Sequence, residues 1–258
     1  MKKLIKKFIK TLTPKFFLNI YDRYKYDLIK TRLMSPRECP ICKYKGIFKT
    51  FGVPERIDAQ CSNCNSLERH RLLFLNLDKK IVNNENGGIK EPILHFAAEE
   101  VLENYFRDKY KNYKTADLQV TPDFIFSKKS DIQLNIENIE VPDSTFNTII
   151  ANHVLEHVDD DKASKEIYRV LIPKGIFIVM IPIIEGWEKT YEDKSITSEN
   201  NRCIHYGQGD HVRYYGRDFR QRIEKNGLKL AQELTAEGND VIKYGLKRGE
   251  KVFVFIKP

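Results

Sequence analysis

The sequence has 258 residues, of which 31% are charged and 41% hydrophobic. These values are typical of a globular protein with one domain and additions, or with two small domains, and they exclude disordered and fibrous classes. The formal net charge of +8 comes from residues 1–33, which hold ten basic and two acidic residues. The remaining residues hold 34 of each sign and are formally neutral.

Residues 1–36 are predicted to form a basic amphipathic helical arm. Leu4, Ile5, Phe8, Ile9 and Leu12 share one helical face, with lysines opposite. Lysines interrupt every apolar stretch, so neither a membrane span of about 18 residues nor a signal peptide is expected. Three partners for residues 1–33 remain open: an anionic membrane surface, which we favour, nucleic acid, or a protein surface. We expect a cytoplasmic protein, and peripheral membrane association is compatible with the arm.

Two cysteine pairs predict a zinc-ribbon-like module over residues 37–65. Cys39-Pro-Ile-Cys42 and Cys61-Ser-Asn-Cys64 flank the segment 43–60, a spacing that brings four thiolates around one tetrahedral Zn²⁺. Four protein ligands leave no open position, so the metal is expected to be structural. A redox pair or two unrelated buried pairs are the alternatives. The fifth cysteine, Cys203, is expected to be a free thiol.

Residues 66–89 are predicted to form a connecting helix and loop. Ser66 is a plausible N-cap, with Glu68 in the first turn. Arg69, His70 and Arg71 then place positive charge beside the cysteine module. We favour contacts with solvent or with the neighbouring domain over an anion site, because charge clusters are usually solvated.

From residue 90 onward, strand-like runs alternate with helix-like ones, which predicts an α/β domain over 90–258. Strands are expected at 92–97, 113–118, 131–136, 146–152, 175–183, 227–234 and 251–257, and helices at 99–110, 160–172 and 216–226. This alternation predicts a Rossmann-like, mostly parallel seven-stranded sheet with an antiparallel edge strand. Such sheets bind ligands at the carboxyl ends of their strands.

One candidate for ligand binding stands out from the residues alone. Ala97 lies at the end of the first strand, and Asp117 ends the second. A carboxylate at that offset can accept hydrogen bonds from both hydroxyls of a ribose, although the usual glycine-rich turn is absent.

Several motifs carry a family resemblance. Asn152-His153-Val154-Leu155-Glu156-His157-Val158 follows an apolar strand, then an acidic helix start and a Pro173-Lys174-Gly175 turn. This order over about 91–182 resembles the class I S-adenosylmethionine-dependent methyltransferases, especially their type 11 branch. Together with CPIC, CSNCNSLERHR, HFAAE and GQGDHVRYYG, it looks like a bacterial group of these enzymes with an N-terminal zinc-binding module.

The resemblance implies a cofactor site for S-adenosylmethionine. The turn of His95, Phe96 and Ala97 would pass the methionine part, Asp117 and Leu118 would hold the ribose, and Asn135 and Ile136 would meet the adenine. Asn152 and His153 would face the methionine and the methyl group. Small side chains at Ala97 and Ala98 would let the backbone approach, as glycine does elsewhere.

Histidines at the carboxyl edge are the candidates for proton transfer, because histidine titrates near neutrality. We favour His153 and His211 as catalytic residues, and Asp210, His211 and Arg213 as substrate-binding residues on a loop with glycine joints. That loop could equally be a packed surface turn. Glu156 and His157 recur across the type 11 branch, which implies support of structure or cofactor.

The sequence therefore predicts a methyltransferase with S-adenosylmethionine and structural Zn²⁺ as cofactors. The Asn/Asp-Pro-Pro-aromatic turn of amine and amide methylases is missing after residue 152. A hydroxyl or carboxyl of a small-molecule, sugar or glycan-precursor acceptor is favoured. Two alternatives remain: an RNA methyltransferase guided by the zinc module, although the neutral body weighs against it, and a non-catalytic zinc-ribbon adaptor.

Overall fold

The computed structural model describes residues 35–52, 54–77, 81, 88–118 and 130–258. Residues 1–33, for which helices and partners were predicted, lie outside the described residues. Parts of the predicted connecting helix and loop also lie outside them. Among the residues described, no helix has the length and apolar character needed to cross a membrane.

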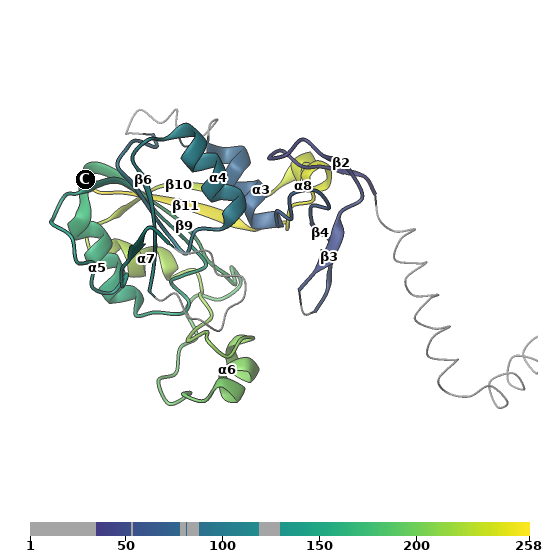
Figure 1. The fold of residues 1–258 in the computed structure, drawn as a ribbon. Coiled ribbons are helices and arrows are strands. Elements are labelled where there is room, and N and C mark those ends of the chain that lie inside the picture. Colours follow the sequence, from purple (N-terminus) through teal and green to yellow (C-terminus); the bar gives the residue numbers. More distant parts are fainter. Residues whose placement is uncertain (1–34, 53, 78–80, 82–87, 119–129) are drawn as a thin grey trace, which may run out of the picture.

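A seven-stranded sheet forms the centre of the α/β body (Figure 1). Its strands are β5 (Ile93–Phe96), β6 (Tyr113–Asp117), β7 (Ile132–Gln133), β8 (Phe146–Asn152), β9 (Leu171–Met180), β10 (Lys229–Thr235) and β11 (Lys251–Ile256). Their order across the sheet is β10-β11-β9-β8-β5-β6-β7. The pairs among β5 to β9 are parallel, whereas β11 runs antiparallel to both β9 and the edge strand β10. This arrangement confirms the predicted fold class.

Helices cover both faces of this sheet. One face packs against α5 (Asp160–Val170) and α7 (Phe219–Glu224), and the other against α3 (Glu68–Asn76), α4 (Glu100–Lys109) and α8 (Gly238–Tyr244). Side chains along β5 alternate between the two faces, so that Leu94 and Phe96 join one core and Ile93 the other. The body is thus a three-layer α/β/α structure (Figure 1).

The junction between α5 and β9 differs from the prediction. Asp159 caps α5 by accepting hydrogen bonds from the backbone N–H groups of Asp161 and Lys162. The helix ends at Val170 and β9 begins at once, ahead of the expected start at 175. The Pro173-Lys174-Gly175 turn lies within β9, where the register against β8 shifts. A bulge therefore absorbs the turn signal without breaking the strand.

Two helices were not predicted. One is α6 (Glu199–Tyr206), which begins after Ser198, whose hydroxyl accepts from the Asn201 N–H, and ends at Gly207 with a φ of 80°. Ile204 on this helix is 79% exposed. The helix lies apart from the layers in Figure 1 and carries no apolar stripe that periodicity could detect. The other is α8, a short helix that contributes Val241 and Tyr244 to the rim of one core.

The cysteine module consists of two small hairpins. The first joins β1 (Arg37–Glu38) to β2 (Lys45–Gly46), and the second joins β3 (Lys49–Phe51) to β4 (Arg56–Gln60). Figure 1 shows the module beside α8, with the β3–β4 hairpin projecting from it. The contacts with α8 include a hydrogen bond from the Arg37 guanidinium to the Ile242 carbonyl at 2.9 Å.

Helix α3 joins the module to the body. Its N-cap is Leu67, and the expected cap Ser66 is wrong: its hydroxyl contacts the sulfurs of Cys39 and Cys64 instead. Arg71 is fully buried, and its guanidinium donates to backbone carbonyls on both sides of the joint. These carbonyls belong to Ala59 and Ser66 in the module and to Tyr244 and Gly245 in the body. The favoured interpretation of this basic cluster, contacts with the neighbouring domain, is therefore confirmed for Arg71.

Candidate functional site

Two residues with left-handed backbone mark the centre of the carboxyl edge. Ala97 follows β5 with a φ of 46°, and His153 follows β8 with a φ of 54°. These strands are neighbours, and the chain reaches β6 on one side of β5 and β8 on the other, so they flank the topological switch point. Both loops turn away sharply there. Ala97 adopts the conformation that glycine favours.

The predicted cofactor residues of the next two strands lie on the surface of the same edge. Asp117 ends β6 half-buried, and its Oδ1 accepts the N–H of Leu118 at 2.7 Å. Leu118 is 56% exposed. Asn135 is exposed beyond β7, and its Oδ1 accepts the N–H of Glu137 at 2.9 Å. The structure therefore brings these three residues to one edge with Ala97, whereas Ile136 is buried in the core.

At the end of β8, several buried polar atoms have no hydrogen-bond partner among the described residues. Asn152 is 3% exposed, and its amide oxygen and nitrogen have no hydrogen-bond partner among the described residues. His153 Nδ1 lies 3.1 Å from Glu156 Oε1, while its buried Nε2 also lacks a described partner. Buried polar groups are normally paired, so such atoms at a strand end point to a ligand.

A cavity of about 400 Å³, here called the His153 cavity, opens between the β3–β4 hairpin and the carboxyl edge. Its walls are mostly charged or polar and include Arg56, Glu68, Arg69, Glu156, Lys247 and Glu250. Burial raises the pKa of the Glu250 carboxyl. Because Phe51 and Gly52 complete the wall, the cysteine module takes part in shaping this cavity.

The predicted substrate loop contributes to this region in two ways. His211 is 6% exposed, and its ring lies 4.7 Å from that of His157 between centroids. Burial lowers the pKa of His211, which favours the neutral form of its imidazole. Asp210 is exposed, and its Oδ2 lies 3.3 Å from His157 Nδ1.

Arg213, the third predicted substrate-binding residue, is committed to internal contacts. It is 2% exposed, and its guanidinium donates to the carbonyls of Leu155 and Val158 and to the carboxylate of Glu192. These bonds hold the 207–213 loop against the start of α5. Its position here is structural, and a contact with substrate stays a prediction.

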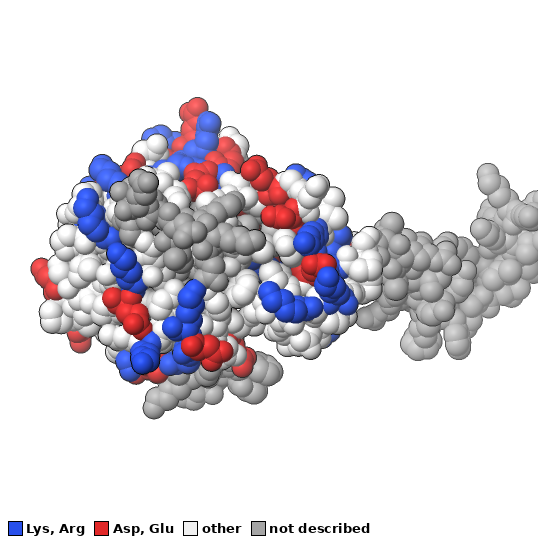
Figure 2. Space-filling view, turned by 90° about the horizontal axis from the view of Figure 1, so that it is seen from above, with Lys and Arg blue, Asp and Glu red and all other residues white. Residues whose placement is uncertain are grey.

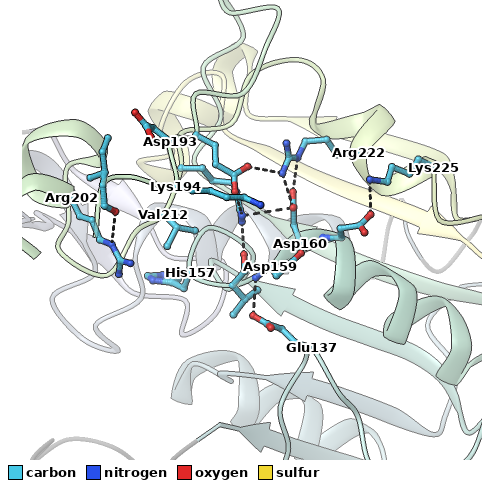
Figure 3. Close-up of a pocket in the computed structure, with 15 residues that line it drawn as sticks. Glu137, His157, Asp159, Asp160, Asp193, Lys194, Arg202, Val212, Arg222 and Lys225 are labelled. Carbon is cyan, nitrogen blue, oxygen red and sulfur yellow. Dashed lines mark hydrogen bonds and ion pairs between the residues drawn. The ribbon is translucent and has the colours of Figure 1, made fainter. Parts of the chain in front are cut away.

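A second, larger cavity of about 570 Å³ lies on the outer side of this loop (Figure 3). Arg222 is paired with Asp160 through two bonds of 2.7 Å each. Figure 3 shows this pair at the right of the view and His157 at the left. Glu192 completes the network through bonds to Arg213 and Arg222. Since the charges here pair with one another, this larger cavity has fewer unsatisfied groups to offer a ligand than the His153 cavity.

A cluster of charged groups connects α3 to the first turn of the body. Glu99 precedes α4 and lies within 3.4 Å of both Arg69 Nε and His70 Nε2, and 3.7 Å from His95 Nε2. Although burial acts to raise it, the pKa of Glu99 is lowered by its bond to His70 and by the nearby cations. His95 is fully buried, and its Nδ1 lies 2.9 Å from the Tyr113 hydroxyl. Its side chain therefore packs inside the body beneath the turn that follows β5.

The four cysteines of the module converge. None of the four forms a disulfide, and their sulfurs lie within 4.8 Å of one another. The Cys39–Cys64 and Cys42–Cys61 sulfur distances are 3.6 and 3.7 Å, far too long for disulfides. A tetrahedron with metal–sulfur bonds of about 2.3 Å has edges of about 3.8 Å, so the set fits Zn²⁺.

Sequence reasoning missed part of this site. Arg56, Lys247 and Glu250 line the His153 cavity, but they come from a hairpin near the start of the chain and a turn near its end. No spacing rule links them. Glu99 could have been identified from the sequence more easily, because it directly follows the turn after the first strand.

The comparisons with known proteins concern the body. Residues 102–179 match the family model described as "Methyltransferase domain". Together with the strand order, this match defines the class: the body has the Rossmann-like fold of the class I methyltransferases. The match covers less than half of the chain and does not extend to the cysteine module.

Two particular proteins illustrate the similarity. The chain is 33% identical over 107 residues to the ubiquinone/menaquinone biosynthesis C-methyltransferase UbiE of Escherichia coli, covering 40% of this chain. It spans 43% of that relative's length. An S-adenosylmethionine-dependent methyltransferase structure from Mesorhizobium loti aligns with a TM-score of 0.48 and 10% identity, over 72% of this chain and 97% of that one.

Proposed function

We propose that the protein transfers a methyl group from S-adenosylmethionine to a hydroxyl or carboxyl of a small-molecule, sugar or glycan-precursor acceptor. The observation that carries this proposal is the switch point. There, Asn152 and His153 present buried polar atoms without described partners, within a domain matched by a methyltransferase family. The cofactor supplies an electrophilic methyl group on a sulfonium.

The proposed cofactor site lies at the carboxyl ends of β5, β6 and β7. In this proposal the exposed Ala97 lets the cofactor approach the backbone, the Asp117 carboxylate accepts from the ribose hydroxyls, and the exposed Asn135 meets the adenine. Asp117 keeps Oδ2 available, because the Leu118 N–H uses Oδ1. In this proposal these residues position the methyl donor beside the end of β8, because orienting the reacting groups lowers the barrier.

The proposed general base is His153. Glu156 Oε1 at 3.1 Å fixes the ring through Nδ1, which leaves the unpartnered Nε2 to accept a proton. An imidazole oriented by a carboxylate is a recurring way to deprotonate a hydroxyl. His211 borders the same cavity and is the second candidate for proton transfer.

The cavity walls support a polar acceptor. Cations of Arg56, Arg69 and Lys247 and carboxylates of Glu68 and Glu250 surround the space beside His153. Such walls match an acceptor with many hydroxyl or acidic groups and disfavour a bulky apolar one. The Escherichia coli relative is named a C-methyltransferase, whereas we propose a hydroxyl or carboxyl acceptor. The acceptor atom must therefore be measured directly.

The described face drawn in Figure 2 offers little support for RNA. Figure 2 shows acidic and basic side chains interspersed on the described face seen there, without a continuous basic track along it. Nucleic-acid binding draws its affinity from such tracks. The adaptor alternative predicts that cofactor binds poorly and that no methyl group is transferred.

The test is methyl transfer from labelled S-adenosylmethionine into fractionated cell extract. We expect label in a polar small-molecule or glycan fraction, and a loss of about 10²-fold or more in kcat for His153→Asn, with KM for cofactor little changed. Arg217→Ala, whose side chain is more than half exposed, is the matched control. Label only in RNA, or full activity of His153→Asn, would contradict the proposal.

A further inference from the structure

Glu156, His157 and His211 converge on the His153 cavity, and the proposed function uses Glu156 only through Oε1 and gives His157 no part. Glu156 is fully buried, His211 is 6% exposed and His157 is partly buried. One ligand atom from each lies within 4.8 Å of the other two. Residues 158–210 separate His157 from His211 along the chain, so the fold, not local sequence, brings the set together.

Each of the three side chains is held through one atom and leaves another available. Glu156 Oε1 contacts His153, and its buried Oε2 has no partner in the described part of the chain. His157 Nδ1 lies 3.3 Å from both the carbonyl and the carboxylate of Asp210, which leaves Nε2. The backbone of Tyr206 hydrogen-bonds the His211 side chain, and the buried His211 Nδ1 has no described hydrogen-bond partner.

This pattern is the one found around metal ligands. A ligating histidine usually donates its other ring N–H to a carboxylate or carbonyl, which fixes both the tautomer and the ring orientation. Two imidazoles and one carboxylate form the ligand set of catalytic zinc sites and of non-haem iron sites, in which further positions stay open. An unpaired Glu156 oxygen in a fully buried position is costly unless a cation or donor meets it.

We propose that Glu156, His157 and His211 bind one divalent first-row transition metal ion through Oε2, Nε2 and Nδ1. All three residues line the His153 cavity, so the remaining coordination positions face its interior and accept an oxygen ligand. The site is distinct from the four-cysteine cluster, because its donors are nitrogen and oxygen and it lies at the carboxyl edge of the sheet. The proposal does not depend on methyl transfer.

Co²⁺ titration tests this site directly. The full chain, with zinc retained in the cysteine cluster, is titrated with Co²⁺ and followed by visible absorption. Binding of one equivalent with d–d bands but without a thiolate-to-cobalt charge-transfer band is expected, because nitrogen and oxygen ligate the ion. Metal analysis after removal of loose ions should give two metals per chain.

Variants assign the ligands. His157→Ala and Glu156→Gln should each weaken Co²⁺ binding by more than about 100-fold, and Asp210→Asn, beside His157, by about 10-fold. His205→Ala is the matched control, because His205 lies on α6, bonded to the Tyr191 hydroxyl. Unchanged cysteine-bound zinc verifies that each variant folds.

Three results would overturn the proposal: no Co²⁺ binding beyond the cysteines, equal binding by His157→Ala and wild type, or equal loss in His205→Ala. None of them bears on cofactor binding at Asp117. A failure of the metal site is therefore distinguishable from a failure of the proposed methyltransferase function.

Discussion

At the scale of residues, Ala97 adopts a backbone conformation that favours glycine. The left-handed conformation of Ala97 costs about 1–2 kcal/mol, and the packing around the first turn offsets this cost. Spacing predicted that the four cysteines converge and that a strand ends at Asp117, whose contact with a ribose stays a prediction. It could not predict that Glu156, His157 and His211 converge, because residues 158–210 separate two of them and no periodicity spans that distance.

The buried His95 makes a prediction about pH. Burial lowers its pKa from 6.5 to about 4, so between these values the unfolded chain binds a proton that the folded chain does not. The stability contributed by the neutral ring is therefore full above pH 6.5 and declines as the pH falls toward 4. Between pH 6.5 and about 5, this costs about 1.5 kcal/mol.

Urea unfolding of wild type and His95→Gln at both pH values measures this effect. The wild type should lose about 1.5 kcal/mol more than the variant on acidification, since the cysteine cluster contributes equally to both. Parallel pH dependence in the two proteins would show that His95 does not titrate as described.

At the scale of elements, amphipathic helices were predictable and isolated ones were not. The predictions at 99–110 and 160–172 correspond to α4 and α5, whose apolar faces meet the sheet. Helix α6 has one buried residue, so its existence depends on caps at Ser198 and Gly207 instead of periodicity. The start of β9 was misplaced, because a proline-glycine turn signal does not distinguish a loop from a bulge.

The joint made by α3 gives the second stability prediction. Arg71→Met removes a buried guanidinium that donates to four backbone carbonyls and leaves them unsatisfied. The free energy of unfolding should fall by at least about 3 kcal/mol.

Chemical unfolding of Arg71→Met, with zinc content measured alongside, checks this expectation. Arg217→Met is the control, because its side chain is 54% exposed and its loss should cost less than about 0.5 kcal/mol. Equal stability of the two variants would mean that the four carbonyls find other donors.

At the scale of the whole molecule, the alternation of strands and helices sufficed to predict the mostly parallel sheet. The same alternation could not predict how the cysteine module packs against the α/β body. The module's placement depends on Arg37 and Arg71, whose partners lie 205 and 173 residues away. This placement makes the β3–β4 hairpin a wall of the His153 cavity, so the module contributes to the acceptor side of the proposed site.

The central claim is that the carboxyl edge binds S-adenosylmethionine, and calorimetric titration of the full chain with this cofactor tests it most directly. We predict one cofactor molecule bound per chain. The affinity of Asp117→Ala for the cofactor should be lower by about 10-fold or more, because this variant loses charge-assisted bonds to the ribose hydroxyls. Absence of binding at millimolar cofactor, or equal affinity of Asp117→Ala and wild type, would contradict the account.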